Sequence, residues 1–285
     1  MARRFAILLV CFTLLGASAA AQTHKYLGFD RNDFPGDAAL PALHRTFSYS
    51  SYWLNPPPGE TRNTWAGKRA TLEKNGFGFL VLFTGRTDAQ LRGTNAAPLG
   101  AADGQSAAVA ARREGFPSNV LIFLDQEEGG RLFPEQMVYL FAWIDVVRAA
   151  GARAGVYCSG IPVRDGNGTI STAESIAERL ASVLQPLPQN AERGPVVLWI
   201  ADDRCPPSPG CSMKAPELPV TSYRSANAIA HVWQYAQSPR RGQFSAACPQ
   251  NQAPDGNCYA PGLPQGPNTP VDLDTADSAD PSAGR

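Results

Sequence analysis

Short apolar runs alternate along the chain with segments in which apolar residues recur at helical spacing. The runs have the length of β-strands and are rich in β-branched and aromatic residues, which pack well on a pleated surface. We therefore expect seven strands and a short last one, at residues 26–29, 47–53, 78–83, 120–124, 154–158, 196–200, 230–234 and 271–273.

Helices are predicted between these strands, at 64–74, 104–114, 134–149 and 172–184. The third is the clearest, since its apolar residues keep helical spacing from Pro134, which suits a first turn, to Gly151, which suits a helix end. Strands with interleaved helices over about 250 residues are typical of a TIM-type (β/α) barrel. We expect an α/β fold of this kind, irregular forms included, with a doubly wound open sheet as the alternative.

The two ends of the chain differ from its middle. Arg3 and Arg4 precede an apolar stretch over 5–15, and small residues at 19–21 offer a cleavage site, so residues 1–21 are predicted to be a signal peptide. No later stretch is apolar for long enough to cross a bilayer. We expect an exported protein, periplasmic or extracellular, without a membrane anchor. A barrel domain over 22–274 would be followed by a flexible tail over 275–285.

Composition narrows the range of partners. The 25 Lys and Arg residues balance the 25 Asp and Glu residues, and no basic run breaks this balance. A near-neutral exported protein lacks the positive surface that nucleic acid or an anionic membrane requires. We therefore expect neither of these partners, and we expect a monomer.

Four of the six cysteines fall in two long segments rich in Pro and Gly, 201–225 and 236–270. Cys205 and Cys211 flank one loop, and Cys248 and Cys258 flank another. In an oxidising compartment each pair is expected to close a local disulfide. Cys158 lies within an apolar run, where a buried structural thiol is expected rather than a nucleophile.

Acidic residues stand where several predicted strands end. Asp125 and Glu127 follow the run 120–124 and, being two apart, would share one face of an extended strand. Paired carboxylates suit glycosidic bond cleavage, which needs a proton donor and a second acid, although a solvated acidic loop is the alternative. Because the strand ends of a barrel meet at one mouth, further acids are expected beside this pair: Asp30, Asp202, Asp203, Asp272 and Asp274.

Aromatic residues accompany the acids. Sugar rings stack on aromatic side chains, so an acidic cleft lined by aromatic rings would suit a carbohydrate, while core packing is the alternative. Tyr157 and Trp199 lie in the middle of predicted strands, which favours the core. For Trp233 and Tyr235 both interpretations stay open.

Six short motifs occur in an order that resembles one enzyme family. They are Gly28-Phe-Asp30, Asp125-Gln-Glu127, Gly155-Val-Tyr157, Leu198-Trp-Ile-Ala201, Trp233-Gln-Tyr235 and Val271-Asp-Leu273. Together they resemble the Chalaropsis-type lysozymes (family 25 muramidases) over residues 26–274. The chain is more similar still to a group of bacterial glycoside-hydrolase-like barrels of unassigned function.

The resemblance implies roles for particular residues. Glu127 would be the general acid, Asp125 its partner carboxylate, and Asp30 and Asp272 flanking acids, acting on a cell-wall polysaccharide such as peptidoglycan. A non-catalytic glycan-binding barrel is the alternative. The chain departs from the lysozymes at Asp274, where they usually have Asn, at the extra acid Glu128 and in the long 236–270 segment. The candidate substrate-binding residues are Asp30, Asp272, Asp202, Tyr157, Trp233 and Tyr235.

Other hydrolase classes lack their signatures in this sequence. A metal-dependent deacetylase needs clustered histidines, whereas His24, His44 and His231 stand far apart. The Gly-x-Ser-x-Gly elbow of serine hydrolases is absent, and no calcium-loop signature accompanies the acids. We expect neither a metal nor a cofactor.

Overall fold

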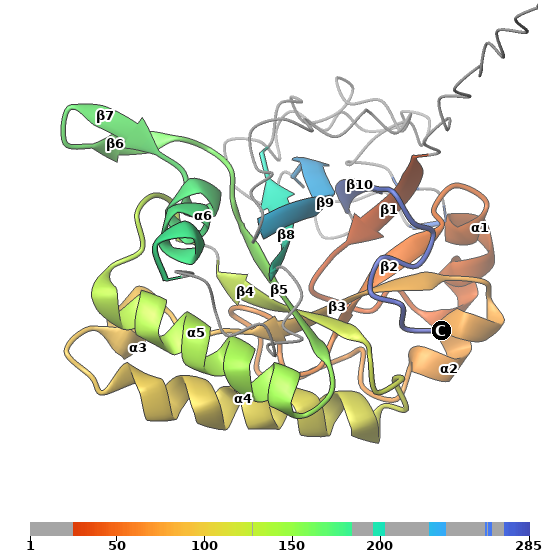
Figure 1. Cartoon of the computed structure of the whole chain (residues 1–285). Coiled ribbons are helices and arrows are strands. Elements are labelled where there is room, and N and C mark those ends of the chain that lie inside the picture. The colour runs from red at the N-terminus through yellow and green to blue at the C-terminus, as the bar shows by residue number, and fades with distance from the viewer. Residues whose placement is uncertain are drawn as a thin grey trace, which may run out of the picture.

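The computed structural model describes residues 25–126, 128–183, 196–202, 228–237, 260, 262–263 and 271–285. Eight strands form a closed barrel in the order β1-β10-β9-β8-β5-β4-β3-β2 (Figure 1). Every strand that the sequence predicts is present, which confirms the α/β barrel. The strands are β1 (Tyr26–Asp30), β2 (Tyr49–Trp53), β3 (Gly78–Thr84), β4 (Leu121–Gln126), β5 (Arg153–Ser159), β8 (Val196–Ala201), β9 (Ala228–Ala236) and β10 (Asp272–Ala276).

The barrel departs from an all-parallel TIM barrel at one strand. β10 runs antiparallel to both of its neighbours, β1 and β9, while the other pairs of adjacent strands are parallel. Reversal of β10 places its first residue, Asp272, opposite Asp30, the last residue of β1. The start of β10 therefore lies at the same end of the barrel as the finish of the parallel strands.

The helices cover the outside of the barrel, and most of them were predicted. They are α1 (Leu40–His44), preceded by the 3-10 turn η1 (Asp37–Ala39), α2 (Arg69–Lys74), α3 (Asp88–Leu91), α4 (Ala96–Arg113), α5 (Pro134–Ala149) and α6 (Thr172–Val183). The prediction for α5 is confirmed at both ends, and α6 begins at its predicted residue, Thr172. α2 is shorter than expected, and η1, α1 and α3 were not predicted. None of the helices in the described ranges is long and apolar enough to cross a membrane.

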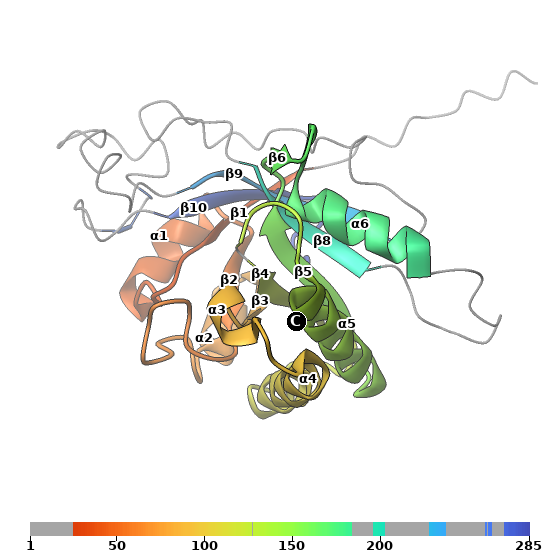
Figure 2. The same cartoon turned by 90° about the vertical axis from the view of Figure 1, so that its left-hand side faces the viewer.

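Helix α4 begins well before its predicted start because its contact with α5 decides its length. The two helices lie side by side in Figures 1 and 2. A Cβ at Gly100 would stand 2.2 Å from the carbonyl oxygen of Tyr139, and one at Gly104 would stand 2.8 Å from that of Trp143. The glycines let the backbones approach closely, although glycine weakens a helix by its own propensity. The pattern of apolar residues does not record this glycine contact and therefore predicted too late a start.

A β-hairpin that the sequence analysis did not predict projects beyond the barrel at β6 (Val163–Asp165) and β7 (Gly168–Ile170). Figures 1 and 2 show it next to α6. Arg131 anchors it by ion pairs with Asp165 (2.8 Å) and with Glu178 of α6 (3.0 Å). Its strands are too short and polar to give a hydrophobic pattern.

The last residues of the chain belong to the folded domain. We expected a flexible tail over 275–285, and this prediction is wrong, since residues 275–276 complete β10. The backbone N–H of Val81 in β3 donates to Oγ of Ser282 (2.9 Å). The carbonyl of Ser282 accepts from the N–H of Leu121, the first residue of β4 (2.8 Å). The tail is bound by backbone and hydroxyl groups, which a search for hydrophobic periodicity does not detect.

Candidate functional site

Acidic residues gather at one end of the barrel, the mouth, where the parallel strands finish. Asp30 is the last residue of β1, Asp125 is the last but one of β4, and Asp202 follows β8 directly. Asp272 lies at the same end because β10 is reversed and pairs it with Asp30. The structure thus brings four of the acids named from the sequence to a single end of the barrel.

Gln234 of β9 joins the acids of β1 and β10. Its Nε2 donates to Asp30 Oδ2 (2.8 Å) and lies 3.4 Å from Asp272 Oδ2. Its Oε1 accepts from the hydroxyl of Tyr157 (2.9 Å) and from Nε2 of Gln237 (3.1 Å). Ionised carboxylates only accept hydrogen bonds, so the amide nitrogen must face them and the amide oxygen must face the donors. Partners on both sides therefore hold the buried Gln234 side chain in one orientation.

Asp274 lies deeper in the barrel than Asp272, two residues further along β10. It is 0% exposed, and its Oδ1 accepts from the indole N–H of Trp199 (2.9 Å). Its carboxyl is in hydrogen-bonding contact with that of Asp30. Burial raises the pKa of Asp274 well above its ordinary value, the charge and contact of Asp30 raise it further, and the Trp199 hydrogen bond lowers it. We call Asp30, Asp272 and Asp274 the carboxyl cluster.

Asp125 faces the barrel interior beside Tyr157, its register partner on β5. Its neighbour Gln126 turns the other way and donates to the carboxylate of Glu128. That carboxylate accepts from the backbone N–H of Asp88, the first residue of α3 on the outside of the barrel (2.6 Å). Since side chains alternate along a strand, Asp125 points inward. Glu128 is thus a structural acid that holds the start of α3.

Aromatic rings fill the barrel below the mouth. The ring of Trp199 lies 5.7 Å from that of Phe123 and 4.7 Å from that of Tyr157, measured between centroids. A Cβ at Gly155 would stand 2.7 Å from the Phe123 ring, so only glycine fits there. This contact explains the glycine of the Gly-Val-Tyr motif. The prediction that Tyr157 and Trp199 belong to the core is confirmed by their burial, although the Tyr157 hydroxyl also orients Gln234.

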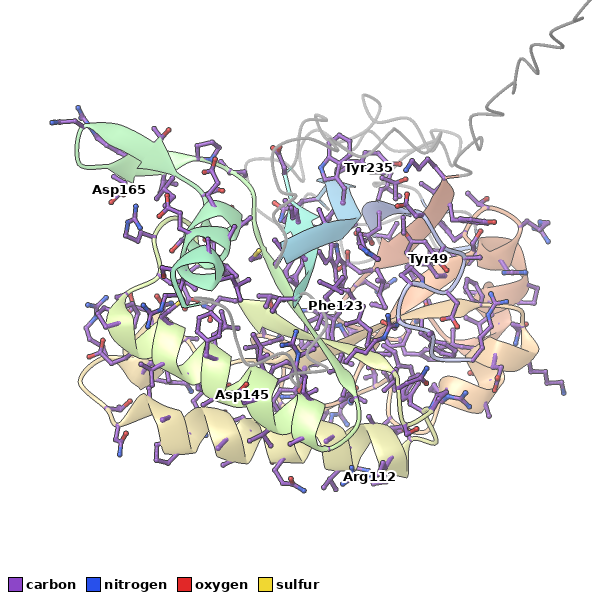
Figure 3. All side chains as sticks on the ribbon, viewed as in Figure 1. Tyr49, Arg112, Phe123, Asp145, Asp165 and Tyr235 are labelled. Carbon is purple, nitrogen blue, oxygen red and sulfur yellow. The ribbon has the colours of Figure 1, made fainter. Side chains whose placement is uncertain are left out.

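Trp233 and Tyr235 flank Gln234 on β9 but are themselves largely buried, with 8% and 2% exposed. The indole N–H of Trp233 donates to the backbone carbonyl of Asp202 (3.0 Å). Between β9 and β10 the register passes from Gln234 opposite Asp274 to Ala236 opposite Leu273, so Tyr235 is the extra residue of a β-bulge. Figure 3 shows Tyr235, Tyr49 and Phe123 among the barrel side chains, away from Asp165 on the hairpin. The buried rings of Trp233 and Tyr235 therefore contribute packing at the rim of the mouth.

Several predictions fall on residues outside the described ranges. Glu127, which follows Gln126 at the end of β4, is one of them, as are residues 1–21. The predicted disulfide cysteines, Cys205, Cys211, Cys248 and Cys258, and the acid Asp203 also lie outside the described ranges. Cys158 is described as a buried free cysteine whose pKa burial raises to about 12, as expected of an unreactive structural thiol. In the ranges given above, no group of three His, Cys, Asp or Glu side chains could hold a metal ion.

Two polar residues of the site were missed as functional groups in the sequence analysis. Gln234 appeared there only as the middle of the Trp-Gln-Tyr motif, and Asp274 was expected among the acids of the mouth but was given no role of its own. A buried polar residue inside an apolar strand is a signal that could have identified both, because such groups need hydrogen-bond partners.

The fold and the acidic mouth define a glycoside-hydrolase-like barrel, and the comparisons with known proteins agree. A family model described as "Rv2525c-like, glycoside hydrolase-like domain" matches residues 52–243. The chain belongs to this family. No curated protein matches the chain.

Two solved structures of low sequence identity share the fold, and a third is reported after them as a weaker similarity. An uncharacterized protein of B. stearothermophilus is 18% identical, with a TM-score of 0.57 over 88% of this chain and 95% of that one. The Tat-secreted protein Rv2525c of Mycobacterium tuberculosis, in complex with L-tartrate, is 11% identical, with a TM-score of 0.50 over 88% and 94%. The bacterial lysozyme from Streptomyces coelicolor is 12% identical, with a TM-score of 0.48 over 90% and 94%.

Proposed function

We propose that the barrel mouth binds a glycan and hydrolyses a glycosidic bond in an amino-sugar polymer such as peptidoglycan. The observation that carries this proposal is the gathering of Asp30, Asp125, Asp202 and Asp272 at one end of the barrel. A sugar ring that enters such a mouth meets several carboxylates, which bind hydroxyl groups and stabilise a positively charged transition state. Membership of a glycoside-hydrolase-like family supports the same reaction class.

Each acid has a distinct proposed role. Glu127 donates the proton to the leaving oxygen, and Asp125 stabilises the developing positive charge or orients a substrate N-acetyl group. Asp30 and Asp272, joined by Gln234, bind sugar hydroxyls. The reaction needs no cofactor. As further sugar contacts, Asp202, Tyr157, Trp233 and Tyr235 stay predictions, and the burial of the three rings favours small contact areas.

The test is the release of reducing ends from purified peptidoglycan and from chitin oligomers. We expect activity in the wild type and a loss of about 10²- to 10⁴-fold in Glu127→Gln, because that variant lacks the proton donor. Glu128→Gln is the matched control, since it makes the same change one residue away while keeping an oxygen for the N–H of Asp88. Equal losses in both variants would refute the role of Glu127.

A non-catalytic glycan-binding barrel is the second candidate. It is favoured by one observation: Asp30 is already bonded within the protein to Gln234 and in contact with Asp274. Inactivity of the wild type and of Glu127→Gln, with both proteins pulled down by the polymer, would establish this alternative. Failure of both activity and pull-down would overturn the glycan proposal altogether.

Export and disulfide formation are proposed together, because disulfides form in the oxidising compartment that an exported protein reaches. Expression in a secreting host should yield a protein that begins at Gln22, which N-terminal mass spectrometry would establish. Thiol labelling after denaturation should modify Cys158 alone, with Cys205–Cys211 and Cys248–Cys258 paired. Labelling of all five cysteines, or an intact leader, would contradict this part of the proposal.

A further inference from the structure

Asp274 is a fully buried acid with an unusual set of neighbours. Its Oδ1 has a donor in Trp199, but its Oδ2 is buried without a hydrogen-bond donor among the described residues. A buried carboxylate oxygen that no donor serves is costly, since the water that would solvate it is excluded. Its carboxyl also contacts that of Asp30, and two ionised carboxylates in contact repel each other.

Among the described residues, the polar groups around Asp274 come from β1, β2, β8, β9 and β10. Trp199 is the donor among them. The others that carry or can acquire charge are acidic or phenolic: Asp30 from β1, Tyr49 from β2, Tyr235 from β9 and Asp272 on β10 itself. Ionisation of Asp274 would therefore add a negative charge to an acidic interior.

We propose that Asp274 carries a proton at neutral pH and donates it in a hydrogen bond to Asp30, so that it acts as a positioning residue for the mouth. A protonated carboxyl supplies the O–H that Oδ2 otherwise lacks, while Oδ1 still accepts from Trp199. Asp30 then accepts from two neighbours, Asp274 and Gln234, and its carboxylate is held in one orientation at the edge of the mouth. The direction of the Asp274 pKa shift agrees with this geometry.

The role of Asp30 as a ligand contact rests on the proposed function, whereas the proton on Asp274 does not. The two claims can therefore fail separately. A protein that binds no glycan would leave the proton intact as a property of the fold, and an ionised Asp274 would overturn the positioning role even in an active hydrolase.

The proton is tested by the pH dependence of unfolding in urea, comparing the wild type with Asp274→Asn. In the unfolded chain Asp274 titrates near 3.8, and in the folded protein its pKa is higher. The stabilising contribution of its proton is thus complete below 3.8 and is lost as the pH rises toward the folded value. The folding constant of the wild type should fall up to tenfold per pH unit over this window relative to Asp274→Asn, which has no proton to lose. Parallel pH profiles of the two proteins would overturn the proposal.

A direct reading of the wild type does not depend on the folding of any variant. In ¹³C-labelled wild-type protein, the carboxyl resonance of Asp274, assigned through its own backbone, should keep the chemical shift of the protonated form from pH 3 to pH 7. Titration of that resonance near its ordinary value would overturn the proposal.

The positioning role is tested by pull-down with insoluble peptidoglycan at neutral pH. Asp274→Asn keeps an N–H for Asp30 and an oxygen for Trp199, so it should bind as the wild type does. Asp274→Leu removes the donor and should weaken binding about 10- to 100-fold, as expected for one hydrogen bond to a charged group. Wild-type binding by Asp274→Leu with an unchanged circular dichroism spectrum, or lost binding by a folded Asp274→Asn, would refute the positioning role.

Discussion

Replacement of Gln234 by Glu tests whether two acids converge on this side chain. The substitution keeps the length and shape of the residue but places an oxygen where Nε2 now donates to Asp30 Oδ2 at 2.8 Å. The oxygen that Gln234 already has, Oε1, accepts from the Tyr157 hydroxyl and is retained in the variant. The variant therefore changes one donor into an acceptor in the middle of the carboxyl cluster.

The expected magnitude follows from two limits. Two full charges at this separation would repel by about 6 kcal/mol at an effective dielectric constant of about 20. The new carboxyl avoids this cost by taking up a proton, which restores a donor toward Asp30. Proton uptake costs about 1.4 kcal/mol for each pH unit above the ordinary Glu value of about 4.3. We therefore expect a loss relative to the wild type of about 4 kcal/mol at pH 7 and about 1 kcal/mol at pH 5.

The sign of the pH dependence separates this mechanism from simple loss of packing. A carboxyl whose pKa rises on folding contributes stability at low pH and loses it as the pH increases. The assay is urea unfolding of the wild type and of Gln234→Glu at both pH values. Gln234→Met is the control, because it removes the hydrogen bonds without adding a titrating group, and its loss should be similar at pH 5 and pH 7. A Gln234→Glu loss that does not change with pH would refute the convergence of acids on position 234.

Two further predictions concern packing and the end of the chain. Gly28→Ala should destabilise the protein by about 3 kcal/mol or more in urea unfolding, because its Cβ would stand 1.9 Å from the ring of Tyr49. Gly168→Ala in the hairpin is the control and should be close to neutral, because the nearest neighbour of its Cβ is 3.9 Å away. Equal effects would contradict the ring placement. Ser282→Ala should cost about 1–3 kcal/mol by leaving the buried N–H of Val81 without its acceptor, and the exposed Ser278→Ala should change stability by less than about 0.5 kcal/mol. A neutral Ser282→Ala would contradict the hydrogen bond from Val81 to the Ser282 hydroxyl.

The sequence predicted the strands well because their apolar character comes from burial on both faces. Such runs are conspicuous whatever the topology around them. The reversal of β10 was not predicted, since a short strand with acids at alternate positions has the same appearance in either direction. Direction is decided by which neighbours supply its hydrogen bonds, here β1 and β9, and this information is not local.

The site could be predicted only in part, for a related reason. Acids at strand ends are visible in the sequence, and the structure brings Asp30, Asp125 and Asp272 to one mouth. Gln234 joins Asp30 to Asp272, and its partners lie 204 positions away at Asp30 and 77 positions away at Tyr157. A residue's partners at such separations follow from barrel closure, which no short motif records.

Reversal of β10 also explains how neighbouring carboxyls acquire different roles. Because β10 enters the barrel from the mouth, Asp272 lies at the rim and Asp274 lies one layer deeper on the same inward face. Opposite Asp274 the register places Gly28, which has no side chain to bring polar groups to this layer. A ligand that enters the mouth can thus contact Asp30 and the half-buried Asp272, while Asp274 is reached by no solvent. Depth along one strand, rather than residue type, separates the acids that can bind a ligand from the acid that holds them in place.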